Sequence, residues 1–140
     1  LVSIDLLVED ESGQFLLGLR NNRPAQGFWF VPGGRIQKNE RLDAAFQRLT
    51  QNELGCRFSR DQARFLGVYE HLYDDSVFGP TPNTHYVVLG YRLTVKRDRL
   101  MLPLEQHSHY RWWGAVELLA SDEVHPNSQV YVQELRSRSL

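Results

Sequence analysis

The side chain with the most evident chemical potential is the carboxylate of Glu53. Segment 42–54 has the apolar spacing of a helix, and Glu53 falls on the same stripe as Leu42, Phe46 and Leu49. A carboxylate on an apolar stripe loses its solvation, which destabilises the fold unless a partner or a cation compensates. The sequence therefore predicts one of three environments for it: an exposed helix end, a partner arginine, or a hard divalent cation.

A glycine pair before this helix favours the cation. Gly33 and Gly34 let the backbone approach a ligand closely and leave carbonyl oxygens available. Carbonyl and carboxylate oxygens are the ligands that hard divalent cations prefer. Arg48 and Arg35 are the residues that would otherwise neutralise Glu53. Both interpretations stay open from residue types alone.

The order of the strands and helices that must position these residues predicts an α+β fold, a mixed sheet with flanking helices. Segments rich in β-branched and aromatic residues predict strands at 1–9, 14–20, 28–31, 64–73, 84–95 and 111–113. Helices are expected at 42–54, closed by a left-handed Gly55, at 116–120, and weakly at 128–140. We expect 32–34 to end a strand as a loop and 125–127 to be a turn. One domain is expected to cover 1–140.

Composition excludes several classes of protein. The 140 residues are 41% hydrophobic and 24% charged, with 16 Lys and Arg against 17 Asp and Glu, so a basic surface for nucleic acid is not expected. The chain has no apolar run long enough to predict a membrane span. Cys56 is the single cysteine, which rules out an intrachain disulfide and fits a reducing compartment. We therefore expect a cytoplasmic protein with neither nucleic-acid nor membrane partners.

The spacing around Glu53 is specific. Gly34, five residues, Glu40, seven residues, Arg48, then Glu53 and Gly55 resembles the Nudix box, GX5EX7REUXEEXGU with U apolar. The preceding segment 29–33 resembles the usual approach to that box. The resemblance implies a mixed sheet sandwiched between helices in an α/β/α arrangement.

Two departures from the box narrow the resemblance. Leu49 and Asn52 stand where the box has glutamates, so Glu53 alone remains of the three carboxylates. This pattern is similar to one branch, the GDP-mannose mannosyl hydrolases, and the likeness extends over most of the chain. The similar segments outside the box are 22–27, 84–90, 102–107, 110–112 and 118–122.

The resemblance implies a reaction and a cofactor. Members of that branch hydrolyse GDP-mannose, and GDP-glucose is a second candidate, by attack of water at C1 of the sugar with inversion. One Mg²⁺, which Mn²⁺ would replace, is expected on Glu53, the side-chain oxygen of Gln106 and the backbone carbonyl of Gly33. Arg20 and Arg35 would steady the diphosphate. The resemblance also implies a homodimer.

The remaining site residues come from the same resemblance. His107 matches the base that activates water, and its residue type suits that work. Asp5 matches a carboxylate facing the developing oxocarbenium charge. Tyr86, Tyr110 and His71 match supporting substrate-binding positions.

Simpler interpretations compete with these assignments. Asp5 alternates with apolar neighbours and could be a solvent-facing strand residue. His107 and His109 could face one way and mimic half a zinc site, although no further ligand lies at useful spacing. Arg48 is favoured as a structural partner of a carboxylate, and Trp112 and its neighbour as packing residues.

Two other functions also remain open. One is a Nudix pyrophosphohydrolase that cleaves the diphosphate of a nucleotide sugar or nucleotide. The other is a non-catalytic module that binds a nucleotide sugar.

Overall fold

The computed structural model describes residues 1–22, 25–73, 84–103 and 107–138, except for the side chains of residues 107, 108 and 138. Its strands are β1 (Val2–Glu9), β2 (Phe15–Arg20), β3 (Trp29–Phe30), β4 (Gly33–Arg35), β5 (Arg64–Tyr73), β6 (Thr84–Thr94) and β7 (His107–Trp113). Its helices are α1 (Leu42–Leu54), α2 (Ala115–Ala120) and α3 (Pro126–Arg138), with short 3₁₀ helices η1 (Arg60–Gln62) and η2 (Arg97–Arg99).

The described strands form one mixed sheet around β1. The order is β3-β2-β1-β6-β5, with β4 paired to β1 and β7 paired to β2. β1 runs parallel to β6 along one edge, and its other pairings are antiparallel. The opposite edge of β1 pairs with two different strands. Ser3 to Asp5 pair with β4, whereas Glu9 pairs with Phe15 of β2. The expected α+β class with a mixed sheet is confirmed.

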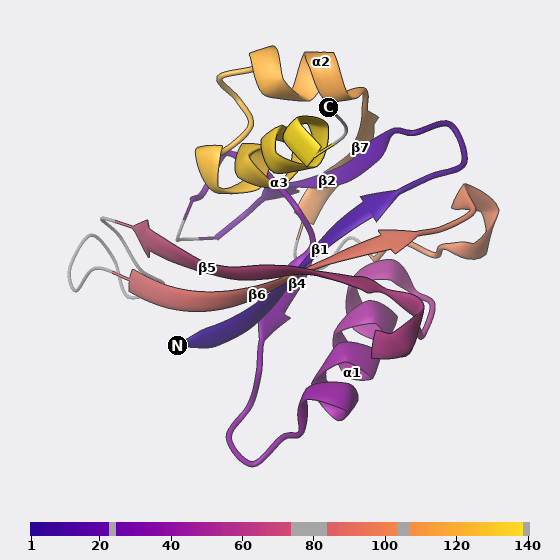
Figure 1. Ribbon diagram of the computed structural model, residues 1–140, viewed down its shortest axis with the longest axis vertical. Helices are drawn as coiled ribbons and strands as arrows, with labels where there is room; N and C mark the ends of the chain where they lie inside the picture. The colour runs from indigo at the N-terminus through magenta and orange to yellow at the C-terminus, as the bar shows by residue number, and fades with distance from the viewer. Residues whose placement is uncertain (23–24, 74–83, 104–106, 139–140) are drawn as a thin grey trace.

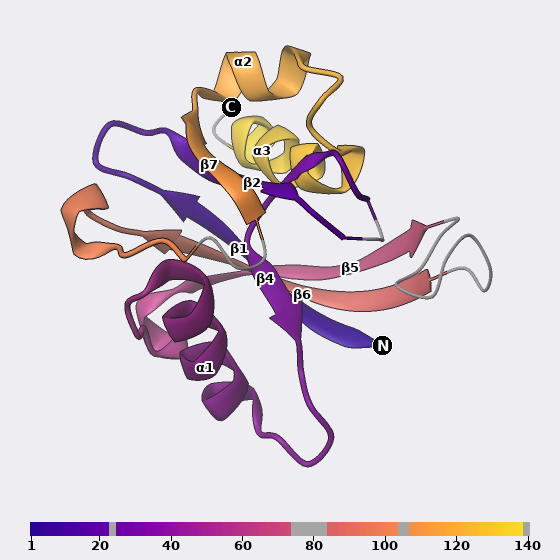
Figure 2. The same ribbon diagram turned by 180° about the vertical axis from the view of Figure 1, so that it is seen from behind.

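Helices cover both faces of this sheet, with α1 on one side and α2 and α3 on the other (Figure 1). The same layers are seen from behind in Figure 2. Successive side chains of β1 alternate between the two faces. Ile4 and Leu6 pack beneath α1 with Phe46, whereas Leu7 packs with Tyr131 of α3. No helix within the described residues is long and apolar enough to cross a membrane.

Helix α1 has the predicted bounds, and Gly55 closes it in the left-handed conformation with φ of 68°. Phe46, Leu49 and Glu53 are all buried, which confirms most of the predicted stripe. Leu42 differs, with 37% of its surface exposed. The reason is its place in the first turn, where it lines an open hollow instead of the core.

The glycine pair was expected to be a loop, and that expectation is wrong. Gly33 and Gly34 belong to β4 and pair with Asp5 and Ile4. A Cβ on Gly33 would lie 2.2 Å from the carbonyl oxygen of Ile4. Glycine therefore lets a short strand lie against β1 where any larger residue would collide.

Other element boundaries also differ from expectation. The strand expected at 28–31 covers only Trp29–Phe30, and β7 begins at His107 instead of residue 111. The longer β7 follows from its partner, because backbone pairing with β2 continues to Arg20. Segment 125–127 is not a separate turn. Pro126 begins α3, since proline is well suited to the first turn of a helix.

Candidate active site

Glu53 is buried, with 2% of its surface exposed. Its Oε1 accepts a hydrogen bond from the Gly33 N–H at 3.3 Å. Its Oε2 is buried and has no hydrogen-bond partner among the described residues. Burial raises the pKa of Glu53 to about 7, against the opposing influence of the Gly33 hydrogen bond and of Arg20. The interpretation of an exposed helix end is therefore wrong, and one carboxylate oxygen is left for a ligand.

Arg48 does not neutralise Glu53. Its Nε donates to Oε2 of Glu40 at 2.7 Å and its Nη2 to Oε1 of Glu40 at 2.9 Å. The same Nη2 donates to the carbonyl of Arg35 at 2.8 Å. This bidentate contact lowers the pKa of Glu40 to about 2. The structural role expected for Arg48 is confirmed, since it ties the loop after β4 to α1.

The backbone of Gly33 faces the same region as Glu53. Leu6 N donates to the carbonyl of Pro32 at 2.8 Å, which makes Asp5 and Gly33 a pair that exchanges no hydrogen bonds. The N–H and C=O of Gly33 consequently point away from β1. The Gly33 N–H donates to Glu53, and the Gly33 carbonyl lies on the same edge of β4 as that N–H. This geometry fits the expectation that the Gly33 carbonyl serves as an oxygen ligand.

Asp5 is 7% exposed and lies on the α3 side of the sheet. Its Oδ2 accepts a hydrogen bond of 2.7 Å from the hydroxyl of Tyr131. Nδ1 of His71 lies 3.8 Å from the same oxygen. Burial raises the pKa of Asp5 to about 7, although Tyr131 and Arg20 act in the opposite direction. The alternative of a solvent-facing strand residue is wrong.

His71 is 4% exposed, and burial lowers its pKa to about 4. Its ring lies against Tyr131 with centroids 6.3 Å apart, and against Tyr73 at the same separation. Tyr73 in turn contacts Tyr86 with centroids 6.2 Å apart. At neutral pH His71 is therefore an uncharged neighbour of Asp5. Tyr86 contacts Tyr73, and Tyr73 contacts His71.

Arg20 connects the two buried carboxylates electrostatically. Its charge acts to lower the pKa of both Asp5 and Glu53, although burial raises the pKa of each carboxyl overall. Arg20 is the last residue of β2 and pairs with His107 of β7 across a bulge. The backbone of His107 thus lies beside Arg20. The His107 side chain and the whole of Gln106 lie outside the described residues.

Two further expected residues flank this group. Tyr110 of β7 is half-buried, and burial together with the charge of Glu53 raises its pKa to about 12. It also packs against the apolar cluster beneath α1, the helix that carries Glu53. Arg35 ends β4, two residues after Gly33, and its side chain is exposed. Because the Arg35 guanidinium is exposed close to Gly33 in the chain, an anionic ligand could contact it there.

The raised pKa values predict how the metal-free protein responds to pH. In the unfolded chain Asp5 and Glu53 have ordinary pKa values of 3.8 and 4.5, so they lose their protons at lower pH than in the folded state. Stability should therefore fall as pH rises through about 7. Neutral His71 has the opposite influence, but only below about pH 6.5. Between pH 6.5 and 8 we expect the unfolding free energy in EDTA to drop by about 1 to 2 kcal/mol.

Urea unfolding at several pH values checks this expectation. The double variant Asp5→Asn/Glu53→Gln is the control and should show a flat profile over the same window. A wild-type profile as flat as that of the double variant would contradict the prediction.

The comparisons with known proteins agree with the box and its geometry. The sequence profile of the NUDIX domain matches residues 1–135. The chain belongs to the Nudix family. It is 40% identical over 111 residues to the low-salt glycan biosynthesis protein Agl8 of Haloferax volcanii, covering 79% of this chain and 69% of that protein. It is 27% identical over 106 residues to the m7GpppN-mRNA hydrolase NUDT17 of Danio rerio, covering 72% of this chain and 35% of that one.

Solved Nudix structures share the fold. A MutT NUDIX hydrolase from Burkholderia pseudomallei aligns over 96% of both chains with a TM-score of 0.76 at 21% identity. A MutT protein from Methanosarcina mazei has a TM-score of 0.79 at 20% identity, covering 99% of this chain and 94% of that one. The NUDIX domain of Shewanella oneidensis NrtR, solved with ADP ribose, has a TM-score of 0.74 at 19% identity, covering 100% and 88%. The Nudix fold expected from the box is thereby confirmed.

The two residues that depart from the Nudix box have different surroundings. Leu49 is buried in the core beneath α1, and a Cβ on Gly34 would lie 2.5 Å from its Cδ2. A glutamate at position 49 would lose these apolar contacts. Asn52 is exposed, whereas the adjacent Glu53 is buried. Across the described residues, no three His, Cys, Asp or Glu side chains gather as a metal cluster.

Sequence reasoning missed Tyr131, although the structure places its hydroxyl on Asp5. The two residues are 126 positions apart, and the helix that carries Tyr131 was expected only weakly. A tyrosine in a helix of mixed polarity offers little to distinguish it from a packing residue. Its contact with Asp5 depends on how α3 packs on the sheet.

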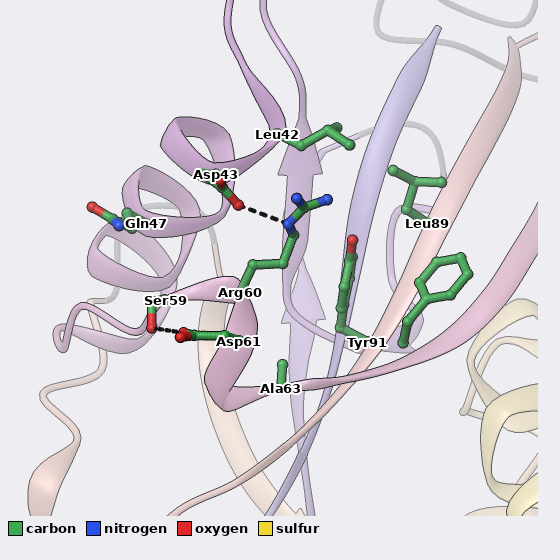
Figure 3. Close-up of a pocket in the computed structure, with 10 residues that line it drawn as sticks. Leu42, Asp43, Gln47, Ser59, Arg60, Asp61, Ala63, Leu89 and Tyr91 are labelled. Carbon is green, nitrogen blue, oxygen red and sulfur yellow. Dashed lines mark hydrogen bonds and ion pairs between the residues drawn. The ribbon is translucent and has the colours of Figure 1, made fainter.

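A separate hollow of about 750 Å³ lies between the first half of α1, η1 and the strands β5 and β6 (Figure 3). Leu89 and Tyr91 form part of its apolar lining, and Arg60 reaches Asp43 across it at 2.8 Å. It includes none of the residues gathered around Glu53 and Asp5. The two regions are therefore distinct.

Proposed function

We propose that this Nudix protein hydrolyses GDP-mannose, with GDP-glucose as a second candidate, to GDP and the free sugar. Water would attack C1 of the sugar with inversion. The observation that carries the proposal is the lone buried Glu53, with Leu49 in the core and Asn52 exposed where the box has two more carboxylates. One carboxylate suits one cation, and a single cation suits departure of GDP better than a multi-metal attack on phosphorus.

The residues present fit a hard divalent cation such as Mg²⁺, with Mn²⁺ as a substitute. Oε2 of Glu53 is buried without a partner among the described groups, and the carbonyl of Gly33 is directed toward the same edge. Both are oxygen ligands, and the side-chain oxygen of Gln106 is proposed as a third. A bound cation would supply neutralisation of the diphosphate charge. Cation binding would also relieve the unfavourable burial of the Glu53 carboxylate.

The chain's own charged residues would support departure of GDP. The charge of Arg20 acts on the pKa of both buried carboxylates, and exposed Arg35 follows Gly33 by two residues. We propose that both donate to the diphosphate as negative charge grows there, with Tyr110 beside Glu53. Arg48 is committed to Glu40 and takes no part in this contact.

The other half of the reaction is proposed to occur at the sugar. The carboxylate form of Asp5, held by Tyr131, would face the positive charge that develops at C1. His71 and Tyr86 would line the same region. His107, whose backbone lies opposite Arg20, is proposed as the base that takes a proton from water.

Two of the similar proteins have names or ligands that bear on the substrate. The name of Agl8 links that relative to glycan biosynthesis, and the NrtR NUDIX domain was solved with ADP ribose, a nucleotide derivative. From these two proteins we infer a nucleotide sugar as the substrate of this chain. A homodimer and a cytoplasmic location remain predictions.

Hydrolysis in ¹⁸O-labelled water tests the proposal. With GDP-mannose and Mg²⁺ we expect the label in mannose and unlabelled GDP, and proton NMR should detect the β-anomer first. Label in GMP or in mannose 1-phosphate would instead identify a pyrophosphohydrolase. Tight binding of GDP-mannose without turnover would identify a binding module. Either result would overturn hydrolysis at C1.

A further inference from the structure

Tyr131 lies at the centre of a buried contact between α3 and the candidate site. It is 1% exposed, and its hydroxyl donates to Oδ2 of Asp5 at 2.7 Å. Its ring packs edge-on against Tyr69 with centroids 4.8 Å apart. A buried hydroxyl with its hydrogen bond directed at a buried carboxylate is a specific arrangement, because either group left alone would be destabilising.

The sheet makes room for this ring at one position. Gly90 of β6 pairs with Asp5 in the parallel register of β1 and β6. A Cβ on Gly90 would lie 2.8 Å from Cε1 of Tyr131 and 3.0 Å from Cε2 of Tyr69. The glycine beside Asp5 therefore leaves the space that the Tyr131 ring occupies, and the ring in turn brings its hydroxyl to Oδ2.

The two oxygens of Asp5 have different surroundings. Oδ2 receives the Tyr131 hydrogen bond, and Nδ1 of His71 lies farther from it, at 3.8 Å. Oδ1 lies 2.9 Å from the point where a Cβ on Gly33 would stand, so it is turned toward β4. The hydrogen bond on one oxygen thus directs the other toward the strand that borders Glu53.

Among the described side chains, the Tyr131 hydroxyl is the donor that lies within hydrogen-bond distance of Asp5. His71 is neutral at physiological pH because burial lowers its pKa to about 4. The charge of Arg20 acts to lower the pKa of Asp5, as it does that of Glu53. Burial and the Asp5 carboxylate both raise the pKa of Tyr131, so its hydroxyl keeps the proton that it donates.

We propose that Tyr131 is a positioning residue that fixes the Asp5 carboxylate with Oδ1 turned toward the sugar site. The inference rests on the role proposed for Asp5 in hydrolysis. Tyr131 touches Asp5 and not the substrate, so it acts on the reaction only through that carboxylate. Removing its hydroxyl should affect the reaction step more than substrate binding.

The variant Tyr131→Phe tests this inference and keeps the buried ring. We expect kcat to fall by about 10- to 100-fold while KM changes by no more than about twofold. Tyr69→Phe is the matched control, because Tyr69 adjoins Tyr131 but donates to Glu134 at 2.5 Å. Tyr69→Phe loses a part-buried hydroxyl with its hydrogen bond, so it should lose no more stability than Tyr131→Phe, whereas kcat should fall only in Tyr131→Phe. Equal kcat values in the two variants would overturn the inference.

A double-mutant cycle separates positioning from general stabilisation. In an Asp5→Asn background, Tyr131→Phe should cause little further loss of kcat, because the group that it positions is already altered. Multiplicative losses would overturn the inference. If Asp5→Asn retained full activity, the proposed role of Asp5 would fail and the inference with it. A large loss in Asp5→Asn alongside a normal Tyr131→Phe would overturn the inference alone.

A crystal structure of Tyr131→Phe provides a readout that needs no turnover. We expect the Asp5 carboxylate to rotate away from its position beside Gly33, with the backbone of β1 unchanged. A carboxylate in the wild-type orientation would overturn the inference even if GDP-mannose proved not to be the substrate.

Discussion

Glu53→Gln should lower turnover of GDP-mannose by about 10²- to 10³-fold, within the range for loss of one preorganised electrostatic group. The amide has nearly the shape of the carboxylate but lacks the charge that attracts a cation to the buried Oε2. Affinity for Mn²⁺, measured by electron paramagnetic resonance, should fall together with turnover. Excess metal should restore part of the activity.

The control for Glu53→Gln is Asn52→Ala, the adjacent exposed position on α1. It changes the same helix turn without touching the buried carboxylate, and should retain wild-type turnover and Mn²⁺ affinity. Glu53→Gln should also retain or increase stability in EDTA at pH 8, because it removes a buried charge that lacks compensation. Unchanged Mn²⁺ binding in Glu53→Gln would exclude Glu53 as a metal ligand.

Gly33→Ala should damage both the fold and the site. Its Cβ would lie 2.2 Å from the Ile4 carbonyl and 2.9 Å from Oδ1 of Asp5, so β4 must move away from β1. We expect a loss of about 1 to 3 kcal/mol in unfolding free energy, as for other overpacked positions. Turnover should fall as well, because the Gly33 carbonyl and the Glu53 hydrogen bond move with β4.

The matched control for Gly33→Ala is Gly114→Ala. A Cβ at Gly114 would meet no atom within 4 Å, and its φ of −67° suits alanine. Urea unfolding and turnover should both stay near the wild-type values in this variant. A Gly33→Ala protein as stable as Gly114→Ala would show that β4 tolerates a side chain, contrary to the geometry.

Local pattern predicted much of the architecture because helices and strands impose periods of 3.6 and 2 residues on their apolar positions. The bounds of α1, its left-handed Gly55 and the burial of Glu53 all follow from a single stretch of sequence. Strand β5 also has its predicted bounds. Errors fell where backbone pairing extended or created a strand without an apolar signal, as in β7 and in β4 at Gly33.

The sequence by itself therefore determined the helix that carries Glu53, the solitary character of that carboxylate, and the family to which the chain belongs. Tertiary structure decided which side chains meet there. Asp5 could face solvent or core with the same strand pattern, and only the packing of α3 brings Tyr131 to it. Gly33 lies beside both Asp5 and Glu53 because β4 pairs with β1 on one side and receives the Glu53 side chain on the other. Such contacts join residues far apart in the chain, and no local period specifies them.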